Sequence, residues 1–216
     1  MDALIQVKNV SKSYKKQTVV KNVSFDIEKG KSYGIKGYNG SGKSVLLKLI
    51  AGYAFPDSGE IVIDGKILKK DIDFIQNAGV VINAPEFIGG LSAFKNLKYL
   101  AEIKRQIGDK EILEILEKFQ LSAAKNKRVS AFSQGMKQRL RLAQALMESP
   151  DILLLDEPMN ALDKEGVKLV KSILKEHVAQ GKTLIFTSHS NEDFSDLADV
   201  CFEIDSGILS RIDVPQ

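Results

Sequence analysis

The sequence predicts an α/β fold in which a mostly parallel sheet carries helices on both faces. The first observation is residues 37–44, which fit G-x-x-x-x-G-K-S between a predicted strand and a predicted helix. The second is that strands and helices alternate around this run, an order typical of a doubly wound sheet. The third is Ile152–Leu155, four apolar residues with the composition of a strand buried on both faces.

The N-terminal part of the chain is predicted to be mainly β structure. Val, Ile and Phe alternate with polar residues before the glycine-rich run, and Asp64-Gly65 between two apolar segments is a strong hairpin signal. Residues 45–51 follow the run as a helix that ends at Gly52. We therefore expect an antiparallel β subdomain beside the start of the parallel sheet. The predicted strands are 4–10, 19–27, 31–36, 60–63, 66–68 and 79–82.

The pattern changes after Asn83. Apolar residues recur at helical spacing in three segments, and Ser92 and Asp109 are predicted N-caps. We expect residues 87–150 to form an α-helical insertion in a single domain that spans 1–216, with 1–86 and 151–216 as core and β subdomain. The predicted helices are 92–106, 109–119, 134–148, 164–180 and 191–197, and the later strands are 151–156, 182–187, 200–204 and 207–212.

Composition excludes several classes of protein. The chain has 216 residues, 44% apolar and 27% charged, which is typical of a globular domain, and its net charge of +3 is too small to indicate nucleic-acid binding. The one cysteine, Cys201, excludes an intramolecular disulfide and a cysteine-based zinc site and is expected to be buried. No apolar run reaches the roughly 18 residues that span a bilayer, and the N-terminus alternates like a strand rather than a signal peptide. A cytoplasmic location is predicted.

The glycine-rich run has the chemistry of a nucleotide phosphate site. Its glycines let backbone N–H groups point at phosphate oxygens, and the following helix N-terminus adds partial positive charge. Lys43 is expected to reach the β- and γ-phosphates and the Ser44 hydroxyl to bind Mg²⁺. A turn that only caps a core helix is the alternative, but chance matches occur in roughly one chain in a hundred. The predicted nucleotide-binding residues of the run are Gly37, Asn39, Gly40, Ser41, Gly42, Lys43, Ser44 and Val45.

Two carboxylates follow the buried strand Ile152–Leu155, at the edge where open α/β sheets place their ligands. Asp156 is expected to hold Mg²⁺, directly or through water, and Glu157 to polarise a water for attack on the γ-phosphate. Acidic residues often end strands as plain caps. The glycine-rich run upstream favours the functional interpretation.

Five ordered motifs resemble those of ATP-binding cassette (ABC) ATPases. Residues 132–139, Phe-Ser-Gln-Gly-Met-Lys-Gln-Arg, are similar to the family's signature, usually written L-S-G-G-Q. Tyr14 matches the aromatic residue that stacks on adenine, Asp163 belongs to a segment that matches the D-loop, and His189 matches the switch histidine. The guanine-reading N-K-x-D motif of small GTPases does not occur in the sequence.

The resemblance implies a dimer that sandwiches two ATP molecules head to tail. Each site would join the glycine-rich run of one subunit to Ser133 and Gly135 of the other, although Ser133 could merely cap its helix. His189 would bond the γ-phosphate and the attacking water, whereas a lone histidine after a strand is usually structural. Tyr14 could equally be a surface turn residue. The other histidine, His177, is expected on a helix surface.

Two positions depart from the family pattern. Asn83 stands where the family carries its Q-loop glutamine and is one methylene shorter, which leaves its reach to Mg²⁺ or water open. Gln134 replaces the first signature glycine and would crowd the partner's ATP unless it points away. Because the residues that carry the chemistry are intact, we predict an active ATPase. These residues are Lys43, Asp156, Glu157 and His189.

The Asn83-x-Pro85 pattern and the signature resemble bacterial exporter ATPases of the bacitracin and lantibiotic resistance type. There a short ATPase serves a separate transmembrane permease from the inner face of the cell membrane, as a homodimer or with a second cassette. The insertion and residues 83–90 would dock the permease, with Phe87 and Ile88 as contacts unless the insertion buries them. A soluble ABC ATPase, as in iron–sulfur cluster assembly, and a regulatory nucleotide-binding cassette are the alternatives.

Overall fold

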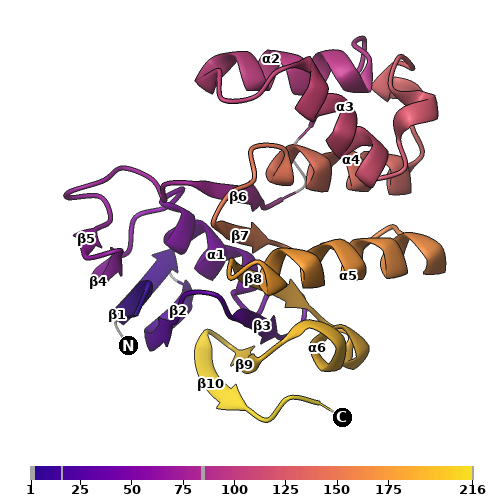
Figure 1. The fold of residues 1–216 in the computed structure, drawn as a ribbon. Helices are drawn as coiled ribbons and strands as arrows, with labels where there is room; N and C mark the ends of the chain where they lie inside the picture. Colours follow the sequence, from indigo (N-terminus) through magenta and orange to yellow (C-terminus); the bar gives the residue numbers. More distant parts are fainter. Residues whose placement is uncertain (1–2, 16, 84–85, 216) are drawn as a thin grey trace.

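Two sheets organise the computed structural model, which describes residues 3–15, 17–83 and 86–215. A four-stranded sheet has the order β2-β1-β4-β5, and a six-stranded sheet has the order β10-β9-β3-β8-β7-β6 (Figure 1). The strands are β1 (Ile5–Tyr14), β2 (Gln17–Ile27), β3 (Ser32–Lys36), β4 (Ser58–Ile63), β5 (Lys66–Ile67), β6 (Ala78–Val81), β7 (Ile152–Leu155), β8 (Thr183–Ser188), β9 (Val200–Asp205) and β10 (Ile208–Ile212).

The six-stranded sheet is parallel except at one edge. Strands β6, β7, β8, β3 and β9 pair in parallel, and β10 pairs antiparallel with β9. Because parallel strands end at a common edge, the segments that follow β3, β7 and β8 lie together there. The helices are α1 (Lys43–Ala51), α2 (Ala93–Lys104), α3 (Asp109–Lys118), α4 (Gln134–Leu146), α5 (Lys164–Ala179) and α6 (Asn191–Leu197), with short 3₁₀ turns η1 (Ser122–Ala124) and η2 (Val129–Ala131).

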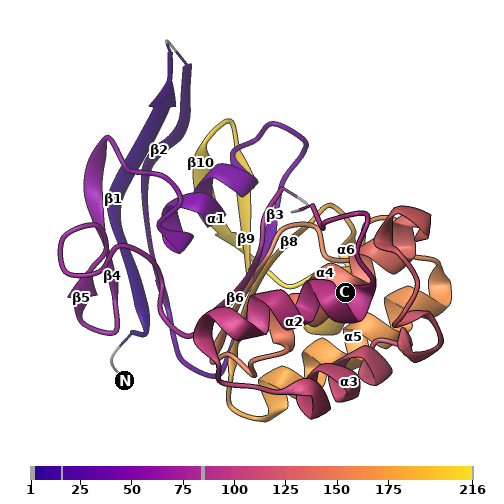
Figure 2. The ribbon, with the colours of Figure 1, turned by 90° about the horizontal axis from the view of Figure 1, so that it is seen from above.

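Helix α1 packs between the two sheets, and the other helices cover the far side of the larger sheet (Figure 2). Leu46 and Ile50 of α1 are fully buried in one hydrophobic cluster with Ile5 of β1 and Ile35 of β3. In a second cluster, apolar residues of helices α2, α3, α4, α5 and α6 pack against the opposite face of β7 and β8. The predicted fold class, an α/β core with an antiparallel β subdomain and a helical insertion, is confirmed.

The helical insertion begins with a capped helix. The Ser92 hydroxyl accepts a hydrogen bond from the Lys95 N–H at 3.2 Å, which confirms it as the N-cap of α2. Asp109 was wrongly predicted as the N-cap of α3. The N-cap is Gly108, whose N–H donates to the Glu111 carboxylate at 2.8 Å, so Glu111 satisfies the helix start and Asp109 is already helical.

Three further sequence predictions have different outcomes. Strands β1 and β2 run past their apolar segments to Tyr14 and from Gln17, because backbone pairing extends over polar residues at the exposed end of this hairpin. Cys201 is buried, as predicted. His177 is also buried, at 5% exposure, so its predicted surface position is wrong. No helix among the described residues is long and apolar enough to cross a membrane.

Candidate nucleotide-binding and hydrolysis site

The glycine-rich run makes the turn from β3 into α1 and lines a cavity of about 300 Å³. Gly42 has φ +115°, and a Cβ there would lie 2.5 Å from the Val19 backbone oxygen, so only glycine fits. Lys43 is 5% exposed, and its Nζ donates to the backbone oxygens of Gly37 at 2.7 Å and Tyr38 at 3.2 Å. The cavity is lined by Val19, Tyr38, Asn39, Gly40, Gly42, Lys43, Ser44, Val45 and Glu157.

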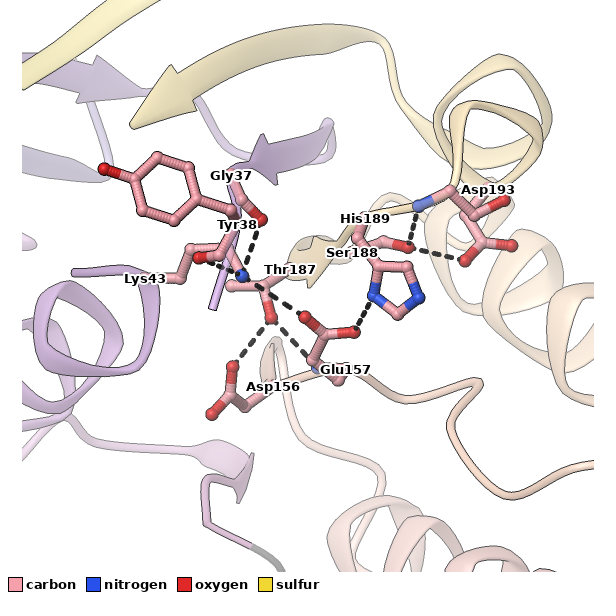
Figure 3. A network of polar contacts seen from close by, with 10 residues as sticks. Gly37, Tyr38, Lys43, Asp156, Glu157, Thr187, Ser188, His189 and Asp193 are labelled. Carbon is pink, nitrogen blue, oxygen red and sulfur yellow. Dashed lines mark hydrogen bonds and ion pairs between the residues drawn. The ribbon is translucent and has the colours of Figure 1, made fainter. Parts of the chain in front are cut away.

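Glu157 lies between the lysine of the run and the predicted switch histidine (Figure 3). One carboxylate oxygen forms an ion pair with Lys43 Nζ at 3.3 Å, and the other is 2.9 Å from His189 Nδ1. The Glu157 side chain is 16% exposed and that of His189 is 65% exposed. The sheet edge thus brings together a cation, a carboxylate and an imidazole that come from three separate segments of the chain.

A residue that sequence reasoning missed aligns the two carboxylates. The Thr187 hydroxyl, at the end of β8, donates to Asp156 Oδ1 at 2.7 Å and accepts from the Glu157 N–H at 2.9 Å (Figure 3). Glu157 adopts φ +51°, a left-handed conformation that is uncommon outside glycine. The Thr187 hydroxyl stabilises this turn. The turn places the Asp156 carboxylate beside Thr187 and the Glu157 carboxylate between Lys43 and His189. In the sequence, only its position directly before Ser188-His189 indicates that Thr187 lies at the site.

The predicted metal ligands Ser44, Asp156 and Asn83 offer hydroxyl, carboxylate and amide oxygens, the hard donors that Mg²⁺ prefers. Ser44 lines the cavity next to Lys43. The Asp156 N–H donates to the Val81 backbone oxygen at 2.7 Å, so Asp156 and Asn83 leave neighbouring strands at the same edge. This donor set fits a magnesium ion shared with a triphosphate. Pro85, the other half of the Asn83-x-Pro85 pattern, lies outside the described residues.

The signature segment opens α4 and rests on the D-loop segment of the same chain. The Ser133 hydroxyl accepts from the Met136 N–H at 3.2 Å and therefore caps the helix. A Cβ on Gly135 would come 3.0 Å from the Ala161 backbone oxygen. Gln134 is exposed, so its side chain is not packed into the subunit. Asp163 caps α5 and accepts from the Gly166 N–H at 2.8 Å.

Of two tyrosines considered for the site, one lines the cavity and the other does not. Tyr14 ends β1, is 48% exposed and does not line the cavity, although Val19 of the paired strand does. Its ring lies 5.4 Å from Lys12 Nζ. Tyr38, which sequence reasoning missed, lines the cavity, and its hydroxyl donates to Asp205 Oδ1 at 3.0 Å. Tyr38 occupies a variable position of the run, so the motif carries no signal for it.

Several curated proteins are similar over most of their length. An uncharacterized ABC transporter ATP-binding protein, YybJ of Bacillus subtilis, is 45% identical over 95% of this chain and 94% of its own. The bacitracin transport ATP-binding protein BcrA of Enterococcus faecalis is 35% identical over 97% of this chain and 68% of its own. The lantibiotic transport ATP-binding protein SrtF of Streptococcus pyogenes is 35% identical over 91% and 84%. These relatives confirm the resemblance stated from the motifs.

A solved structure shares the architecture. The dimeric ATP-binding cassette MJ0796, bound to ADP and phosphate after hydrolysis, superposes with a TM-score of 0.85 at 26% identity, covering 97% of this chain and 99% of its own. The ABC transporter family matches residues 20–160, which include the glycine-rich run, the signature and the Asp156-Glu157 pair. The chain is an ATP-binding cassette ATPase and belongs to the ABC transporter family.

Proposed function

We propose that this chain is the ATP-hydrolysing subunit of a membrane transporter and drives a separate permease, with export as the favoured direction. The observation that carries the proposal is the position of Glu157, held between Lys43 and His189 beside the phosphate-binding cavity. The names of relatives in bacitracin and lantibiotic transport support a transport role. The resemblance of the signature to exporter ATPases favours export. In this role the chain works at the inner face of the cell membrane.

Several residues at the sheet edge have separate roles in hydrolysis. Lys43 binds the γ-phosphate, and Glu157 accepts a proton from the water whose oxygen attacks phosphorus, so that ADP and phosphate leave. His189 holds the attacking water against the γ-phosphate. Ser44 and Asp156, with Asn83 nearby, would hold Mg²⁺, which would neutralise phosphate charge. The adenine stacks on Tyr14 of the β1–β2 hairpin, whose other strand contributes Val19 to the cavity lining.

A second cassette completes each site. Ser133 and the Gly135 N–H, at the N-terminus of α4, face the γ-phosphate bound by the partner, and the helix N-terminus favours that anion. Gln134, between Ser133 and Gly135, would lie in this interface, and its side chain is exposed rather than packed into its own subunit. The dimeric state of the structural neighbour supports this arrangement. ATP closes the dimer and hydrolysis reopens it.

The permease docks where the helical insertion, residues 87–150, meets the core. A hollow of about 240 Å³ lies there between β6, α2 and α4. Its lining includes the exposed side chains of Tyr53 and Ile103, which together offer apolar surface to a partner. Of the two contacts expected from sequence, Ile88 is 61% exposed, whereas Phe87 packs against the helical core.

Replacement of the carboxylate tests the catalytic proposal. Glu157→Gln is expected to bind ATP and lose hydrolysis, since an amide accepts no proton at neutral pH. Glu165→Gln is the matched control, because the Glu165 carboxylate is 81% exposed and pairs only with Lys168 in the contacts described. Unchanged turnover in Glu157→Gln would remove Glu157 as the base.

Co-purification from detergent-solubilised cells tests the transport proposal. The wild-type chain is expected to bring down a polytopic membrane protein, and Ile103→Glu is expected to lose it because the charge enters the docking hollow. Ile208→Glu is the control, since Ile208 is 56% exposed but lies on β10, away from that hollow. Recovery with soluble ribosomal or cluster-assembly proteins would refute the transporter assignment.

A further inference from the structure

Lys171 on α5 is a charged residue buried behind the site. Its side chain is 9% exposed, and its Nζ lies 2.7 Å from Asp196 Oδ2, 3.0 Å from Asp193 Oδ1 and 3.3 Å from the Glu192 backbone oxygen. Burial acts to lower the pKa of Lys171, but hydrogen bonds from its Nζ to Asp196 and Asp193 outweigh burial and raise that pKa overall. The residue is therefore a fixed positive charge that ties α5 to α6.

The ion pair continues to the segment that carries His189. Asp193 is 6% exposed, and its second oxygen accepts from the Ser188 hydroxyl at 2.7 Å. The same hydroxyl accepts from the Ser190 N–H at 3.0 Å. Ser188 and Ser190 flank His189, so these hydrogen bonds hold the backbone on both sides of the histidine. Figure 3 shows Ser188 between His189 and Asp193.

The His189 side chain is exposed, whereas the groups that hold its backbone are buried. Its ring contacts the Glu157 carboxylate at 2.9 Å, and its backbone is held on both sides by hydrogen bonds to buried polar groups. Lys171, Asp193, His189 and Glu157 also line one hollow of about 220 Å³. A buried ion pair is weak evidence for stability alone, because desolvation offsets its attraction.

We infer that Lys171 is a positioning residue for hydrolysis: through Asp193 and Ser188 it fixes His189 relative to Glu157. This inference rests on the proposed role of His189. It predicts that loss of Lys171 lowers kcat rather than ATP affinity, since Lys171 does not line the phosphate-binding cavity.

The first test measures ATPase kinetics of Lys171→Met, Lys171→Arg and Lys168→Met. Lys171→Met is expected to lower kcat at least about tenfold with KM nearly unchanged, because a shift of about 1 Å in a catalytic group can cost a hundredfold. Lys171→Arg should restore most of the loss, since it keeps the charge. Lys168→Met is the control on the same helix, where the Lys168 side chain is 74% exposed.

The second test combines each variant with His189→Ala. If Lys171 acts through His189, Lys171→Met should lower kcat no further in the His189→Ala background. Ser188→Ala keeps the Lys171–Asp193 ion pair and removes the next link, so it should reproduce the kcat loss even if Lys171→Met folds poorly.

The outcomes separate the two proposals. If His189→Ala retains wild-type kcat, the proposed role of His189 fails, and the inference fails with it. If His189→Ala loses activity while Ser188→Ala stays within about twofold of wild type, the inference alone is overturned. An equal loss from Lys171→Met with and without His189 would likewise overturn it.

Discussion

Lowering the pH from 7 to 5 is expected to weaken the fold through His177 of α5. Burial, reinforced by the positive charge of Lys182, lowers the pKa of His177 from 6.5 to about 4; Lys118 also lowers it, while a hydrogen bond with the Thr183 backbone and the charge of Asp151 oppose the shift. Among the described residues, its Nε2 has no hydrogen-bond partner. The folded protein therefore keeps this imidazole neutral.

The sign and size of the effect follow from proton linkage. Between pH 6.5 and 4 the unfolded chain binds a proton that the folded chain does not, so stability falls as pH falls through this range. A difference of about 2.5 pKa units corresponds to a full effect of about 3 kcal/mol, of which about 2 kcal/mol is lost between pH 7 and pH 5. The contribution is complete above pH 6.5.

Urea unfolding at pH 7, 6 and 5 measures this loss in the wild type and in His177→Gln. The variant cannot gain a charge at this position, so its free energy of unfolding should fall by about 2 kcal/mol less than that of the wild type. Carboxylate titrations contribute equally to both proteins and cancel in the comparison. Parallel pH dependences in the two proteins would refute the assignment of the effect to His177.

Three further predictions concern the site. Gly42→Ala is expected to lose binding of a fluorescent ATP analogue, because its Cβ would lie 2.5 Å from a backbone oxygen; wild-type affinity would contradict this backbone argument. Tyr14→Ala should raise the KM for ATP about tenfold by loss of base stacking, and Tyr14→Phe should not; equal KM values would exclude Tyr14 from the site. Ser133→Ala should lower the free energy of unfolding by about 1 kcal/mol through loss of the α4 cap, and a stability equal to that of wild type in urea would show that the cap is dispensable.

The sequence predicted those parts of the structure that depend on local patterns. Lys43 and Glu157 could be assigned to one site from their motifs, because parallel strands place their carboxyl ends at one edge. The contacts of Thr187 and Lys171 could not be predicted, since they join segments that share no motif. His177 was a different error. Its position completes the i, i+3, i+4, i+7 spacing of the buried residues Val170, Ile173 and Leu174, so the helical period favours burial. The surface prediction was wrong because it rested on the polarity of the side chain.

The burial of Cys201 has a practical consequence for watching this protein work. Its side chain is 1% exposed, and burial raises the pKa of the thiol, so little reactive thiolate forms near neutral pH. Because it is the only cysteine in the chain, the wild-type protein should react slowly with maleimide labels. A cysteine introduced at an exposed place such as Tyr99, 52% exposed on α2, would then carry a single spectroscopic reporter. In a homodimer, two such reporters would record the separation of the subunits through each catalytic cycle, without first replacing the native cysteine.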